Sequence, residues 1–134
     1  MAKFPTAEWA EAFYNKLNTD QQYAQIAHKW EGDFYFVIEP GGAVTEQVVF
    51  YFDLWHGKCR EYLQITDMSV KKPAFILKAP YESFKKVVAG DMHPMTAMMT
   101  GKLHVQGSMG VMMRSVPTVL DFVRCAREVT DSFV

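Results

Sequence analysis

The N-terminal part of the chain has apolar residues at helical spacing. Thr6 is placed to cap a first helix, and Glu8 lies in the first turn, where the helix dipole favours a carboxylate. The residues that share one face of this helix are Trp9, Ala10, Phe13, Tyr14 and Leu17. A second capping signal, Thr19 followed by Gln22, predicts a second helix. Its apolar face carries Tyr23, Ile26, Ala27 and Trp30.

The period of the pattern then changes to two, which is typical of strands with one buried face. Three successive runs alternate in this way and are separated by short turns that contain glycine. Because short turns join antiparallel strands, these runs predict an antiparallel meander. Two further strands are expected later in the chain. The five expected strands cover residues 33–40, 45–55, 59–66, 74–79 and 102–107.

Helical spacing returns after the fourth expected strand. A helix over residues 81–89 is expected to end at Gly90, because glycine suits a left-handed C-cap, and Pro94 suits the first turn of the next short helix. Further helices are expected after Gly107 and from Pro117. The last one should place Val119, Leu120, Val123 and Ala126 inward. The predicted fold class is α+β: a single domain, residues 1–134, with a five-stranded, largely antiparallel sheet covered on one face by helices.

The methionines are concentrated in one segment, because seven of the nine lie between Asp91 and Arg114. They form two stripes at i, i+3 and i+4 on two short expected helices. The stripes are Met95, Met98 and Met99, and Met109, Met112 and Met113. One interpretation is that these side chains simply fill the core. The other is an adaptable wall around an apolar ligand, because methionine re-packs easily around irregular shapes.

Charge and composition exclude some partners. The net charge is −1 and the pI is about 6.4, which argues against a large phosphate-binding surface and therefore against nucleic acid. The two cysteines have no zinc spacing and are expected to be free, buried thiols. No signal peptide and no run of ~20 apolar residues is visible, so a cytoplasmic protein is expected.

The polar residues carry no recognisable catalytic or metal motif. None of the four histidines stands in a metal-ligand pattern, and no GxSxG motif or ordered catalytic triad occurs. Asp53 is expected to face outward from its strand. We therefore assign no catalytic residue, no metal site and no cofactor, and we do not expect an enzyme.

An ordered set of features surrounds the methionines: the turn His56-Gly57-Lys58, a strand, the helical stretch Phe84–Gly90, Pro94 and Ala97, and then Thr100–Gly107. In this order the set resembles a known family, the sterol carrier protein-2 (SCP2) domain. The resemblance extends over about residues 30 to 130. It implies a five-stranded sheet packed on helices around an apolar tunnel, and a carrier of fatty acids, acyl-CoA, sterols or other lipids.

The expected function is therefore non-catalytic lipid binding, with an apolar lipid (fatty acid, acyl-CoA or sterol-like) as the partner. The expected lipid-binding residues are Phe75, Leu77, Met95, Met98, Met99, Val105, Met112, Met113, Leu120 and Val123. The lysine pairs at 71–72 and 85–86 leave open transient contact with a membrane. Two other roles stay open: an accessory subunit that presents a quinone or acyl-CoA intermediate to an enzyme, and a homodimeric interaction module. The protein is expected to be a monomer or a homodimer.

Overall fold

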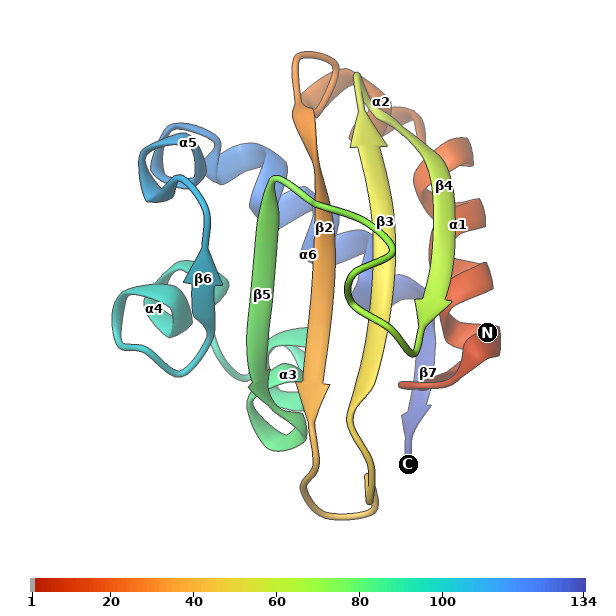
Figure 1. Ribbon diagram of the computed structural model, residues 1–134. Helices are drawn as coiled ribbons and strands as arrows, with labels where there is room; N and C mark the ends of the chain where they lie inside the picture. The colour runs from red at the N-terminus through yellow and green to blue at the C-terminus, as the bar shows by residue number, and fades with distance from the viewer. Residues whose placement is uncertain (1) are drawn as a thin grey trace.

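The computed structural model describes residues 2–134 as helices packed on one face of a sheet (Figure 1). The helices are α1 (Ala7–Thr19), α2 (Gln21–Ile26), α3 (Tyr81–Ala89), α4 (Pro94–Met99), α5 (Met109–Arg114) and α6 (Val116–Val129). The strands are β1 (Ala2–Phe4), β2 (Glu31–Glu39), β3 (Val48–Trp55), β4 (Lys58–Ile65), β5 (Phe75–Pro80), β6 (His104–Gln106) and β7 (Thr130–Phe133).

The main sheet has five strands in the order β4-β3-β2-β5-β6. β2, β3 and β4 form the predicted antiparallel meander, and β6 pairs antiparallel with β5. The pairing of β5 with β2 is parallel, because the connection over residues 66–74 crosses from the edge strand β4 to the far side of β2 (Figure 1). The predicted fold class, a largely antiparallel five-stranded sheet covered by helices, is therefore confirmed.

The inner face of the sheet is almost entirely aromatic and aliphatic. Because side chains alternate along a strand, Phe34 and Phe36 of β2 point to the helices and stand in register with Phe52 and Phe50 of β3. On the other side, Leu77 of β5 pairs with Phe36. The helices cover this face, which makes it the main core.

The outer face of the sheet is covered in part by the segment 66–74, which connects β4 to β5, and not by helices. Tyr35 and Tyr51 belong to a second, smaller buried cluster on this face. The crossing segment 66–74 is fastened there, because the Tyr35 hydroxyl lies 2.9 Å from the Met68 carbonyl oxygen and accepts a hydrogen bond from the Lys71 N–H. The segment thus shields apolar strand residues that the helices do not reach.

The structure tests three of the predicted helix caps. Thr6 caps α1 as predicted, since its side chain accepts from the Trp9 N–H at 3.2 Å. The second helix is capped by Asp20 and not by Thr19, whose hydroxyl is bonded back to the Asn15 carbonyl at 2.8 Å. Gly90 ends α3 with φ of 89°, the left-handed C-cap that was expected.

Two other features differ from the prediction. The second helix ends at Ile26, so Trp30 does not lie on its face but is buried just before β2, and Ile26 is exposed. The chain ends also form a two-stranded parallel sheet, β1 with β7, which was not predicted. Strands of three and four residues are too short for an alternating pattern to show.

A polar network joins α6 to the junction of α1 and α2. The guanidinium of Arg124 contacts Asp20 at 2.6 Å, Asp121 at 2.7 Å and Glu128 at 2.9 Å. Asp121 is only 5% exposed, and its carboxylate also accepts from the Gln22 side-chain amide. Arg124 therefore compensates carboxylates that would otherwise be expensive to bury.

We predict that Arg124→Met lowers the free energy of unfolding by about 3 kcal/mol at pH 7, because Asp121 stays buried without its cation and Asp20 keeps only its ion pair with Lys16. In the wild type, Arg124 holds the pKa of Asp20 below its ordinary value. That stabilisation is present above about pH 4 and is lost as the pH falls and the carboxylate takes up a proton. The difference in free energy of unfolding between variant and wild type, measured by urea titration, should therefore be smaller at pH 3 than at pH 7.

Arg127→Met is the matched control. Arg127 lies on the same helix, is exposed and forms no ion pair within residues 2–134. Its replacement should change the free energy of unfolding by about 0.5 kcal/mol or less. Equal losses for the two variants would contradict a specific role for the network.

Candidate functional site

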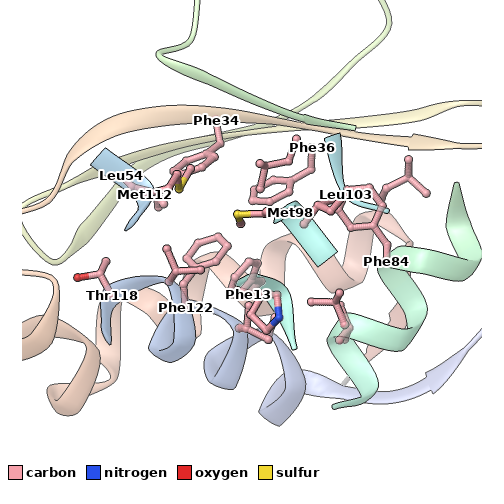
Figure 2. A pocket seen from close by; sticks show the side chains of 18 of the residues that line it. Phe13, Phe34, Phe36, Leu54, Phe84, Met98, Leu103, Met112, Thr118 and Phe122 are labelled. Atoms are coloured by element: carbon pink, nitrogen blue, oxygen red, sulfur yellow. The ribbon is translucent and has the colours of Figure 1, made fainter. Parts of the chain in front are cut away.

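An apolar cavity of about 70 Å³ lies between the inner face of the sheet and the helices (Figure 2). The residues that line it from the sheet are Phe34, Phe36, Ile38, Leu54 and Leu77. Residues before β2 that line it are Phe4, Trp9, Phe13, Tyr23 and Trp30. The remaining lining residues are Phe84, Val87, Val88, Pro94, Met98, Leu103, Met112, Thr118, Val119, Phe122, Val123 and Ala126.

Phe122 of α6 fixes the spacing between helix and sheet. Its ring stacks on those of Phe36 and Phe34, with ring centroids 5.6 Å and 6.1 Å apart. It also packs edge to face with the ring of Phe13, at a centroid distance of 4.7 Å. Aromatic rings are large and rigid, so they hold the two layers apart where smaller side chains would let them close. The cavity is the space left beside these rings.

Met98 of α4 and Met112 of α5 reach into this space from different helices (Figure 2). Both side chains are buried, and Met112 has no exposed surface at all. An unbranched thioether can change rotamer at little cost, so these two side chains can move aside for a guest more easily than the rings around them. They make the wall of the cavity deformable at two points.

The indole N–H groups of the two tryptophans that line the cavity are bonded to other parts of the protein. The indole N–H of Trp9 donates to the Thr130 hydroxyl at 2.8 Å, and that of Trp30 donates to the Gly32 carbonyl at 3.0 Å. Among residues 2–134, no acidic, basic or cysteine side chain lines the cavity. The surface of the cavity is apolar, which favours the burial of an apolar group of a ligand.

The cavity is too small to hold a whole lipid as it stands. Ligand pockets span ~300–1,000 Å³, against about 70 Å³ here. At roughly 24 cal/mol per Å³, an empty space of this size costs about 1.7 kcal/mol, which a domain can tolerate. A ligand would therefore have to enlarge the cavity by displacing flexible side chains.

The structure places the residues expected to bind lipid in three groups. Leu77, Met98, Met112 and Val123 line the cavity. Phe75 and Met95 are buried in the surrounding core and Val105 packs against it, but none of the three lines the cavity.

Met99, Met113 and Leu120 face solvent instead, with exposed fractions of 68%, 47% and 38%. Each follows an inward residue by one position, and a rotation of about 100° carries it off the buried face. The prediction that all three methionines of a stripe share a wall is therefore wrong, as is the inward placement of Leu120. α4 buries Pro94, Met95, Ala97 and Met98, whereas α5 buries only Met112.

Sequence reasoning missed several lining residues, of which Phe122 is the most central. Phe122 stands three residues after Val119 and four before Ala126, so the helical spacing itself could have identified it. Phe34, Phe36 and Phe84 are buried residues of β2 and α3. Their place beside the cavity depends on how sheet and helices pack, which spacing along one element does not show.

Asp20, Asp121 and Cys125 are the one group of potential metal ligands found within residues 2–134, with ligand atoms within 4.8 Å of one another. Both carboxylates are bound to the Arg124 guanidinium. Burial raises the pKa of the Cys125 thiol to about 12, so it stays protonated and is a poor ligand. The group is explained by the network around α6, and we assign it no metal.

Comparison with known proteins identifies similar chains. Residues 11–119 match the model of the SCP-2 sterol transfer family. A crystal structure of sterol carrier protein 2 superposes with a TM-score of 0.84 at 28% identity, over 93% of this chain and 98% of that one. A conserved hypothetical protein from Thermus thermophilus gives 0.83 at 28% identity, over 93% and 88%.

Sterol carrier protein-2 from Aedes aegypti, solved in complex with palmitate, shares the fold with a TM-score of 0.56. The identity is 17%, over 88% of this chain and 93% of that one. No protein of curated function matches the chain in sequence. The region matched by the family, residues 11–119, runs from α1 into the first turn of α6 and so includes the whole five-stranded sheet.

We predict that Met112→Ala lowers the free energy of unfolding by about 2–4 kcal/mol, because it removes buried atoms and enlarges the cavity. Met113→Ala, one residue further on the same helix, should cost about 0.5 kcal/mol or less because that side chain is largely in solvent. Urea unfolding of both variants measures the difference. Similar costs at the two positions would contradict the assignment of Met112 to the cavity wall.

Proposed function

Because the chain belongs to the SCP-2 sterol transfer family, we propose that it binds a lipid and carries it with the acyl or other apolar part in the cavity between sheet and helices. The predicted family is thereby confirmed, while the ligand and the carrier role are our proposal. The observation that carries the proposal is the cavity itself, since no charged side chain within residues 2–134 lines it and the indole N–H groups of Trp9 and Trp30 are bonded elsewhere.

Burial of an acyl chain supplies the driving force. At ~0.8 kcal/mol per methylene, a sixteen-carbon chain gains about 13 kcal/mol gross. Lost translational freedom, ordering of the chain and displacement of Met98 and Met112 take back much of this. A modest net affinity suits a carrier, because the lipid must also be released to a membrane or a partner.

The proposed ligand class is a fatty acyl chain, a sterol-like molecule or a similar apolar lipid. Palmitate is a suitable probe, being the fatty acid bound by the Aedes aegypti protein of the same fold. The proposal assigns binding to Leu77, Met98, Met112 and Val123 among the residues predicted from sequence. We propose no catalytic step.

A second candidate, an interaction module, is favoured by the exposed apolar side chains. Met99, Met113 and Leu120 stand out from α4, α5 and α6, and a partner surface could cover them. None of the helices within residues 2–134 meets the length and apolarity required to cross a membrane. A concentration-dependent dimer without lipid binding would support this second candidate over the first.

We predict that Met98→Gln with Met112→Gln weakens palmitate binding at least tenfold, because two amides placed in the cavity wall must be desolvated against a hydrocarbon chain. Displacement of a fluorescent fatty acid measures the affinity. Urea titration and circular dichroism establish first that the variant is folded under the conditions used.

The matched control is Met99→Gln with Met113→Gln, which makes the same chemical change one residue along the same two helices. Its palmitate affinity should equal that of the wild type, since both side chains face solvent. If the control weakens binding as much as the first variant, the lipid does not occupy the cavity, and a binding site on the helix surface is favoured instead.

A further inference from the structure

A second, polar cleft of about 380 Å³ adjoins the apolar cavity. It is formed by the end of α2, the start of β2, α5 and the first turn of α6, and it shares two lining residues, Trp30 and Thr118, with the cavity. Figure 1 shows α2 and α5 at the same end of the sheet. In Figure 2, Thr118 lies at the same end of the cavity as Met112 and Leu54.

The short helix α5 divides the two spaces. Val111 lines the cleft, whereas the next residue, Met112, is fully buried and lines the cavity. A molecule that lay in both would pass along α5, beside Trp30 and Thr118. This is the arrangement that an amphiphile needs, with an apolar interior next to a hydrated polar recess.

The charges of the cleft favour an anion. Lys29 and Arg114 both line it, both are exposed, and neither forms an ion pair within residues 2–134. Glu31 also lines the cleft, but its carboxylate is bonded to the His56 Nε2 atom at 2.6 Å. An arginine and a lysine that converge on one recess can bind a carboxylate or a phosphate through charge-assisted hydrogen bonds.

From this geometry we propose that the cleft binds the anionic head group of the lipid, through Lys29 and Arg114, while the chain enters the cavity past Trp30 and Thr118. The inference rests on the proposed lipid-binding function and narrows it to anionic, chain-bearing amphiphiles. A neutral lipid of the same chain length would leave two cations without a counterion and would bind more weakly. The shared chemistry of the head group is a carboxylate or a phosphate.

The test compares three probes with the same sixteen-carbon chain: palmitate, hexadecyl phosphate and hexadecanol. The wild type should bind at least one of the two anions roughly tenfold more tightly than the alcohol, the size expected of a charge-assisted hydrogen bond. Lys29→Gln with Arg114→Gln should remove this preference and leave the affinity for hexadecanol unchanged. Whichever anion loses more affinity identifies the head group as carboxylate or phosphate.

Lys72→Gln with Lys102→Gln is the matched control, because it removes two exposed positive charges that lie outside the cleft. It should leave the anion preference intact. An equal loss in the control, or a cleft variant that keeps its preference for the anions, would overturn the head-group site while the lipid-binding proposal stands. Failure of the wild type to bind any of the three probes would overturn the lipid-binding proposal itself.

Discussion

The stacking of Phe122 between the helical layer and the sheet is the contact on which the interior depends. Its ring lies against both Phe36 and Phe34, so α6 cannot approach the sheet more closely than rigid aromatic rings allow. The flexible side chains of Met98 and Met112, a residue type that fills irregular gaps, line the space beside these rings. The interior thus combines rigid rings with flexible side chains and is lined by apolar surface.

The cavity expansion that we propose requires the helical framework to stay in place, and polar contacts hold part of it. Arg124 ties α6 to Asp20 at the junction of α1 and α2, on the side of α6 that does not face the cavity. The short helices α4 and α5 have no comparable network of ion pairs within residues 2–134. The framework that carries Phe122 is therefore anchored, while the elements that carry the two cavity methionines are held chiefly by packing, as helices this short must be.

Patterns in the sequence predict features within one element or between neighbouring elements, but not contacts between elements far apart in the chain. Alternation identified three successive strands, and the short turns between them predicted a meander, because short turns join antiparallel neighbours. The parallel pairing of β5 with β2 was out of reach, since alternation does not state which strand is the neighbour. The concentration of methionines pointed to α4 and α5, each of which contributes one methionine to the cavity lining. Spacing alone gave Met99 and Met113 the same weight as Met98 and Met112. Which side of a six-residue helix is buried depends on tertiary packing.

The most direct test of an expandable lipid cavity is methyl NMR of the protein with ¹³C-labelled methionine methyl groups, titrated with palmitate. The account predicts that the Met98 and Met112 methyl signals shift and show contacts to chain methylenes, while those of Met99 and Met113 stay near their positions in the free protein. Shifts confined to Met99 and Met113, with Met98 and Met112 unchanged at saturation, would contradict it and would place the lipid on the surface of the helices.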